Sequence, residues 1–264
     1  MCSKRGLMQT HAGITVAALS DIGCQRQNNE DFYAYWEPDT ADDFARRGRL
    51  AVVADGMGGY EGGEEASRLA VKTVCEIYRE LPANDLRTVL LQAFATAHER
   101  IRAYAEQHPR LLGMGTTCTA AALRDSELYF AHVGDSRLYL LRGGQITRLT
   151  RDHSYVGRLV ENGIVASTEA DNHPQRHILT AALGAGRDVI ADCPEQPLAL
   201  EEGDVLVLCT DGLWSLLRDD ELQSKVAGRI PEEACRDLVA LARQRGGPDN
   251  ITVQVLRVGE GGGR

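Results

Sequence analysis

Residues 50–59, Leu-Ala-Val-Val-Ala-Asp-Gly-Met-Gly-Gly, hold the pattern that decides how this chain folds. Five apolar residues predict a buried strand, which runs without a break into Asp55 and Gly56. Three other apolar runs also carry an aspartate at one tip: Phe130–Val133 leads into Gly134-Asp135, Val205–Thr210 leads into Asp211, and Asp249 precedes Ile251–Val258. Strands packed in one core can bring such tips together.

Clustered carboxylates repel one another unless protons or cations neutralise them. The candidate ligands are oxygen atoms only, without His or Cys, which favours Mg²⁺ or Mn²⁺ over Zn²⁺. For any single Asp-Gly or Asp-Asn pair, an ordinary turn is the simpler interpretation. Four such tips together favour a metal site.

Outward from this stretch, short strands are predicted before it and paired helices after it. A polar loop over Glu37–Arg49 is expected to lead into residue 50, and Asn84 is the expected N-cap of the second helix. The predicted elements are strands at Ile14–Ser20, Asp31–Trp36 and Leu50–Ala54, helices at Glu64–Glu80 and from Asn84 to Pro109, an antiparallel meander of strands at Thr116–Leu123, Glu127–Val133, Arg137–Leu141 and Gln145–Leu149, strands near Val189–Cys193 and Val205–Cys209, helices near Asp219–Ala227 and Pro231–Arg245, and a last strand at Ile251–Val258.

Helices that come in pairs between blocks of strands favour an α+β layered fold over a doubly wound parallel sheet. We expect one domain over residues 1–258, a mobile flap over residues 152–176, and a disordered tail over residues 259–264.

Composition excludes several classes of protein. The 264 residues carry a net charge of −9, which argues against binding to nucleic-acid phosphates. No segment is apolar enough to cross a bilayer, and the N-terminus lacks a secretory pattern. Seven scattered cysteines without a Cys-x-x-Cys pair indicate reduced thiols. We therefore expect a cytoplasmic protein that binds neither nucleic acid nor membrane.

A lone arginine, Arg26, is predicted on a turn between two strands, close to Glu30 and Asp31. A guanidinium can grip two oxygens of a phosphate group. The alternative is a surface ion pair with Glu30 or Asp31, which would stabilise little. The glycines after Asp55 let the backbone approach an ion closely and offer the Gly56 carbonyl as a ligand, although such a cluster by itself could be an ordinary flexible loop.

In order along nearly the whole chain, these residues resemble the metal-dependent (PPM, or type 2C) Ser/Thr protein phosphatases, in particular the bacterial single-domain members. Eight motifs in the order typical of the family carry the resemblance: Asp21–Asp31, Val53–Gly59, Gly115–Thr117, Val133–Arg137, Leu149–Ser154, Leu179–Gly184, Cys209–Trp214 and Gly247–Thr252.

The resemblance implies a β-sandwich of two antiparallel sheets flanked by helix pairs, with two Mn²⁺ or Mg²⁺ ions in a cleft at one end. It implies these site roles: Asp55 bridges the two ions, the Gly56 carbonyl binds one, Asp211 and Asp249 complete the other, Asp135 with Asp211 binds a third and weaker ion, Glu30 and Asp31 hold waters of the ions, and Arg26 holds the substrate phosphate.

The implied reaction is direct hydrolysis of phosphoserine or phosphothreonine by water that the two ions activate. The implied partners are phosphoproteins, including a Ser/Thr kinase, and the chain would act as a monomer. Met57 and Tyr60 stand where relatives carry a His that can protonate the leaving oxygen, and neither is a convincing acid. A metal-bound water is the first candidate for the proton donor, and His153 on the flap is the second.

Other functions fit the sequence less well. Cys118 and Arg124 match the Cys-x₅-Arg spacing of thiolate phosphatases, but the residues between them contain no glycine and are predicted to form a strand. Ser136 lacks the Gly-x-Ser-x-Gly setting of a serine hydrolase. A phosphate-binding module without catalysis would usually have lost a metal aspartate or the arginine, and hydrolysis of a small phosphoester would use the same residues.

Overall fold

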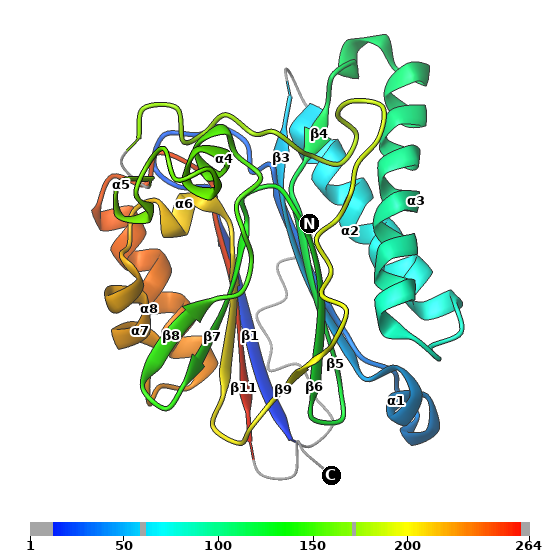
Figure 1. The fold of residues 1–264 in the computed structure, drawn as a ribbon, viewed down its shortest axis with the longest axis vertical. Helices are drawn as coiled ribbons and strands as arrows, with labels where there is room; N and C mark the ends of the chain where they lie inside the picture. The colour runs from blue at the N-terminus through cyan, green and yellow to red at the C-terminus, as the bar shows by residue number, and fades with distance from the viewer. Residues whose placement is uncertain (1–12, 59–61, 171–172, 260–264) are drawn as a thin grey trace.

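Two antiparallel sheets face each other, and helices cover their outer faces, in a computed structural model that describes residues 13–58, 62–170 and 173–259 (Figure 1). The first sheet has the order β1 (Ile14–Asp21), β11 (Ile251–Val258), β10 (Val205–Cys209), β7 (Arg137–Arg142), β8 (Gln145–Arg148). The second has the order β2 (Asp31–Trp36), β3 (Arg49–Met57), β5 (Cys118–Arg124), β6 (Glu127–Val133), β9 (Leu198–Ala199), and β4 (Gly115–Thr116) pairs with β3. The predicted α+β sandwich is confirmed.

Helices α2 (Gly62–Glu80) and α3 (Leu86–Gln107) lie outside the second sheet, and α7 (Asp219–Val226) and α8 (Pro231–Gln244) lie outside the first (Figure 1). Three apolar cores result: one between the sheets and one under each helix pair. None of the helices in the described part of the chain combines the length and apolarity that crossing a bilayer requires.

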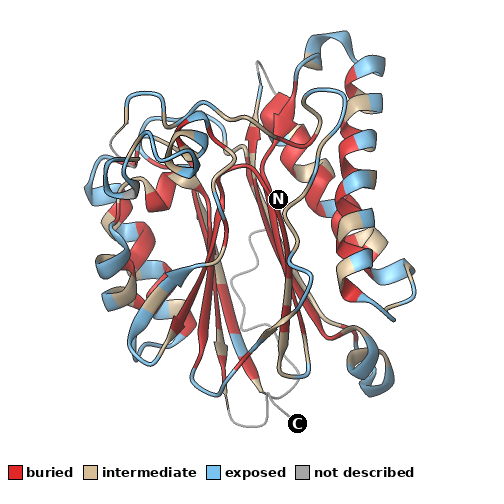
Figure 2. Cartoon of the chain, viewed as in Figure 1, coloured by how far each residue is buried: buried red, intermediate tan, exposed pale blue. Residues whose placement is uncertain are grey.

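Strand β3 shows why residues 50–54 contain no polar residue. Val52 and Ala54 pack towards the helices, whereas Ala51 and Val53 pack towards the opposite sheet. Both faces of the strand are therefore buried, and the usual alternation of polar and apolar residues is lost. Figure 2 shows the inner strands of the sheets largely as buried, whereas the edge strand β8 is largely exposed.

Strand register brings the acidic tips to one end of the sandwich. Asp31 at the start of β2 lies opposite Asp55 near the end of β3. Cys209 at the end of β10 pairs with both Val253 of β11 and Arg137 of β7. Asp211 follows β10, Asp249 precedes β11 and Asp135 precedes β7, so all three lie at the same edge of the first sheet.

The predicted meander is wrong in its connectivity. β5 and β6 form one hairpin and β7 and β8 form another, but these hairpins belong to different sheets. Two-residue connections close both hairpins, at Asp125-Ser126 and at Gly143-Gly144. The three residues between β6 and β7 instead carry the chain across from one sheet to the other.

Local predictions also needed correction. The expected loop over Glu37–Arg49 contains helix α1 (Ala41–Arg47), which Thr40 caps by accepting a hydrogen bond from the Asp43 amide. α1 buries none of its residues, so no apolar stripe marks it. The N-cap of α3 is Asp85 rather than Asn84.

Two predictions over the later part of the chain also differ from the structure. In place of a strand near Val189–Cys193, a single bridge joins Asp192 to His132. The flap contains two short helices, α4 (Tyr155–Glu161) and α5 (Ser167–Ala170), and its residues 171 and 172 lie outside the described ranges. The tail is described only at Gly259.

Candidate active site

A cleft of about 740 Å³ opens at the acidic end of the sandwich. Its lining includes every predicted site residue except Asp31 and His153, and these residues come from five separate segments of the chain: Arg26, Glu30, Asp55, Gly56, Asp135, Asp211 and Asp249. Asp31 lies close by but is buried, with 6% of its surface exposed. The structure therefore brings together residues up to 223 positions apart.

Backbone hydrogen bonds fix the central part of the cleft. The Asp55 amide donates to the Thr117 hydroxyl (2.9 Å), and the Asp55 carbonyl accepts from the Thr117 amide (2.9 Å) and the Thr116 hydroxyl (2.8 Å). The Gly56 amide donates to the Glu30 carbonyl at 3.1 Å. A Cβ atom at Gly56 would lie 1.9 Å from the Gly63 carbonyl oxygen, so glycine is required here by the close approach of α2.

Asn250 holds the turn that carries Arg26 and Glu30. Its side-chain amide donates to the carbonyls of Ile22 (3.0 Å) and Asn28 (2.9 Å), and its side-chain oxygen accepts from the Glu30 amide at 2.8 Å. The start of β11 is thereby tied to the turn between β1 and β2. Asp249 and Asn250 together fit an ordinary turn, so the residue type of Asn250 does not by itself predict this role.

Burial and mutual repulsion act on the acidic groups. Burial, followed by the charges of Asp31 and Asp211, raises the pKa of Asp55 well above its ordinary value. Burial and Asp211 do the same to the pKa of Asp135, and burial raises the pKa of Asp31 to about 7. One carboxylate oxygen of Asp31 and one of Asp211 are buried without a hydrogen-bond donor. A cation fits such a site, because it would offset the repulsion and satisfy oxygens that lack a donor.

Arg26 and Asp249 form an ion pair at the rim of the cleft. The guanidinium donates to Asp249 Oδ2 at 2.7 Å, and Asp249 Oδ1 accepts from the Asn250 amide at 2.8 Å. Across the described ranges, no three His, Cys, Asp or Glu side chains are grouped so that they could hold a metal ion by themselves. In this structure Arg26 supplies the positive charge beside Asp249.

His153 does not line the cleft. Its Nδ1 accepts a hydrogen bond from the Gly134 amide (3.3 Å), and its Nε2 lies 3.4 Å from Asp192. Both nitrogens are thus occupied at a neighbouring pocket. Two residues that the sequence reasoning missed, Arg176 and His177, do line the cleft, and His177 Nδ1 lies 3.6 Å from Asp211.

The residues of the two rejected mechanisms are structural in this fold. Cys118 is fully buried in β5, and burial raises the pKa of its thiol, which disfavours a reactive thiolate. Ser136 is also fully buried, and its hydroxyl lies 2.6 Å from that of Thr117. Met57 lines the cleft, whereas Tyr60 lies outside the described residues.

Comparisons with known proteins find relatives that match most of this chain. Residues 25–240 match the family model of protein phosphatase 2C. The serine/threonine protein phosphatase PstP of Mycobacterium tuberculosis is 39% identical over 92% of this chain, and the chain spans 44% of the length of that relative. The serine/threonine phosphatase Stp of Listeria monocytogenes is 35% identical over 90% of this chain and 93% of its own.

Solved structures show the same likeness. The crystal structure of M. tuberculosis PstP superimposes with a TM-score of 0.84 at 35% identity and covers 94% of this chain and 100% of that one. A structure of the catalytic domain of PstP in complex with two manganese ions superimposes with a TM-score of 0.81 at 34% identity, over 94% of this chain and 99% of that one. The present chain belongs to the metal-dependent protein phosphatase 2C family.

Proposed function

We propose that this chain is a serine/threonine protein phosphatase that hydrolyses phosphoserine and phosphothreonine in proteins. The observation that carries the proposal is the cleft in which Asp55, Asp135, Asp211 and Asp249 meet beside Arg26. The relatives named above are serine/threonine phosphatases, which supports the same reaction here.

The proposed cofactors are two Mn²⁺ or Mg²⁺ ions, with a third and weaker site at Asp135 and Asp211. Asp55, the Gly56 carbonyl, Asp211 and Asp249 would hold the first two. When bound, these cations would activate water for direct attack on phosphorus, so no phosphorylated enzyme is expected. The buried oxygens of Asp31 and Asp211 that lack a donor support this assignment.

The remaining roles fall to side chains of the chain itself. Arg26 would bind the phosphate oxygens, since its side chain is 48% exposed at the rim and points towards Asp249. Glu30 and Asp31 would orient waters around the ions, because their backbones are fixed by Asn250 and by pairing with β3. We do not assign the proton donor to His153, which faces a different pocket.

The proposed partners are phosphoproteins, among them a Ser/Thr kinase whose signalling the chain would reverse. A single catalytic domain over residues 1–258, a monomeric state and a cytoplasmic location remain predictions. The acidic charge of −9 supports the prediction that nucleic acid is not a partner.

The test is turnover of phosphoserine, phosphothreonine and phosphotyrosine peptides with and without Mn²⁺. We expect hydrolysis of the first two with Mn²⁺, loss of turnover in EDTA, and resistance to thiol alkylation. Asp211→Asn should nearly abolish turnover, whereas Asp39→Asn, an exposed acidic residue that does not line the cleft, should not. Full turnover in EDTA would reject the proposal, and phosphopeptide binding without hydrolysis would favour a binding module instead.

A further inference from the structure

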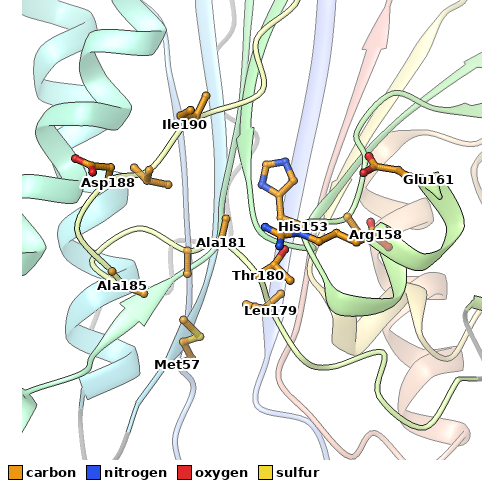
Figure 3. A pocket seen from close by; sticks show the side chains of 14 residues that line it. Met57, His153, Arg158, Glu161, Leu179, Thr180, Ala181, Ala185, Asp188 and Ile190 are labelled. Carbon is orange, nitrogen blue, oxygen red and sulfur yellow. The ribbon is translucent and has the colours of Figure 1, made fainter.

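A second pocket, of about 480 Å³, adjoins the acidic cleft, and we call it the side pocket. Met57 and Leu179 line both spaces, so these two residues form the boundary between them. Figure 3 shows the side pocket with Met57 at one end and Ile190 at the other. Of the predicted site residues, only His153 lines the side pocket, and both of its ring nitrogens are already engaged.

One wall of the side pocket is mostly aliphatic but also carries Asp188, and the opposite wall is polar. The aliphatic wall comes from the connection between α5 and β9, through Ala181, Ala185, Val189 and Ile190. The flap supplies the other wall, where Arg158 and Glu161 lie across from Asp188 and Ala185 (Figure 3). This combination of an apolar surface with a few polar groups is typical of ligand pockets in this size range.

The boundary at Met57 depends on Gly115. A Cβ atom at position 115 would lie 3.0 Å from the terminal methyl of Met57 and 3.1 Å from the Leu183 carbonyl oxygen. The absence of a side chain at Gly115 therefore leaves room for the methionine at this place. Met57 thus presents a flexible thioether to both spaces, and such side chains adapt to varied apolar partners.

Two side chains of the side pocket stand out, one by its exposure and the other by the lack of an ion-pair partner among the described residues. Ile190 is 83% exposed, although it is a large aliphatic residue on a pocket wall. Arg158 makes no ion pair with any residue within the described ranges, whereas Glu161 lies 3.4 Å from Arg151. An exposed aliphatic side chain, together with a guanidinium that is unpaired among the described residues, suits a peptide, whose side chains can bury apolar surface while its carbonyls accept hydrogen bonds.

We propose that the side pocket binds a bulky aliphatic side chain of the phosphoprotein substrate, a few residues from the phosphorylated one. This inference rests on the proposed function, because it requires the phosphate to lie in the acidic cleft. Neighbouring residues of an extended peptide advance by about 3.3 Å each, so one short segment reaches both of two adjoining pockets. The occupant is the substrate itself because the side pocket adjoins the acidic cleft across Met57 and Leu179.

The experiment compares phosphothreonine peptides that differ only in having leucine or alanine at one flanking position, tested in turn on each side of the phosphorylated residue. With Mn²⁺, we expect leucine to raise kcat/KM about tenfold at one position, the lower end of what an apolar pocket discriminates. The ratio of kcat/KM for the two peptides is taken within each protein, which cancels any difference in the fraction of active protein.

Three variants locate the preference. Ile190→Ser removes the uncovered aliphatic wall and should reduce the leucine preference to below about threefold, and Ala185→Trp should remove it by filling the pocket. Ile164→Ser is the matched control, because Ile164 is also exposed (69%) but does not line the side pocket, and it should keep the full preference.

The outcomes separate the two proposals. Equal use of leucine and alanine peptides at every position, or full preference in both Ile190→Ser and Ala185→Trp, would overturn the side-pocket proposal. Failure to hydrolyse both p-nitrophenyl phosphate and every phosphopeptide with Mn²⁺ would instead reject the phosphatase function itself.

Discussion

Replacing Gly56 by alanine tests whether close backbone packing positions the proposed metal ligand. Gly56 lies in β3 and its φ is not in the left-handed region, so the effect of the substitution is steric. The new Cβ would lie 1.9 Å from the Gly63 carbonyl oxygen and 2.8 Å from the Glu30 carbonyl oxygen, whereas real Cβ contacts essentially never fall below 3.0 Å. The start of α2 must therefore move away from the tip of β3.

Because backbone rather than a flexible side chain must yield, we place the cost at the upper end for overpacking, about 3 kcal/mol in the free energy of unfolding. For a domain of this size that corresponds to a fall of roughly 6–12 °C in Tm. A displacement of about 1 Å at the Gly56 carbonyl should also reduce turnover about 100-fold.

Thermal unfolding in EDTA measures the first effect. Turnover of a phosphothreonine peptide with Mn²⁺, at a temperature where both proteins are folded, measures the second. Gly62→Ala is the matched control, since its Cβ would meet only the Met114 side chain and backbone, at 3.2 Å and 3.9 Å, and alanine suits the helix that begins there. If Gly56→Ala has the same Tm and the same turnover of the peptide as Gly62→Ala, the proposed steric argument is refuted.

Three further predictions concern the metals, the phosphate and the response to acid. Asp211→Asn should abolish the rise in Tm that Mn²⁺ gives the unaltered chain, about 2.7 kcal/mol of stabilisation at one hundred times Kd, and an equal rise in the variant would contradict its role as a ligand. Arg26→Ala should mainly raise KM for the phosphopeptide, because the proposed metal ligands of the cleft remain. A loss confined to kcat would argue against phosphate binding by Arg26 in the ground state. Burial and the neighbouring His153 lower the pKa of His132 to about 4. The stability that comes from keeping His132 neutral is therefore complete above its ordinary pKa near 6.5. It is lost as the pH falls towards 4, which lowers the free energy of unfolding by up to about 3 kcal/mol. The free energy of unfolding of His132→Gln, measured in urea, should fall less over that pH range than that of the unaltered chain. An equal fall in the two proteins would refute the assignment.

The elements that could be predicted from the sequence are those whose apolar pattern is local. β3 and β10 are apolar on both faces, and α2 and α8 each bury one stripe, so their existence follows from neighbouring residues alone. Helix α1 buries nothing and is marked only by its cap and its terminal charges, which a search for apolar periodicity overlooks. The crossing between sheets after β6 likewise depends on which strands pair, a property of the whole fold rather than of residues 134–136.

The candidate site shows the same division between local and long-range information. The sequence places each aspartate at a strand tip, and sheet register then brings the tips together. It does not reveal that Asp249 pairs with Arg26, or that Gly134 and Asp192 engage His153 beside another pocket. Those contacts depend on side-chain directions that only tertiary packing determines.

The acidic cluster cannot easily relax to relieve its own repulsion, because its supports are anchored to backbone. The Thr210 hydroxyl donates to Asp31 (2.8 Å) and accepts from the Thr252 amide (3.0 Å), which ties β2, β10 and β11 together beneath the cleft. Thr117 holds Asp55 in the same manner. The three apolar cores hold these strands in place, so moving the carboxylates apart would disturb packing that stabilises the whole molecule. Repulsion that the fold cannot relieve by movement must be offset by protons, as the raised pKa values of Asp31, Asp55 and Asp135 show, or by cations, and this is the physical reason to expect cations in the cleft rather than a rearranged protein.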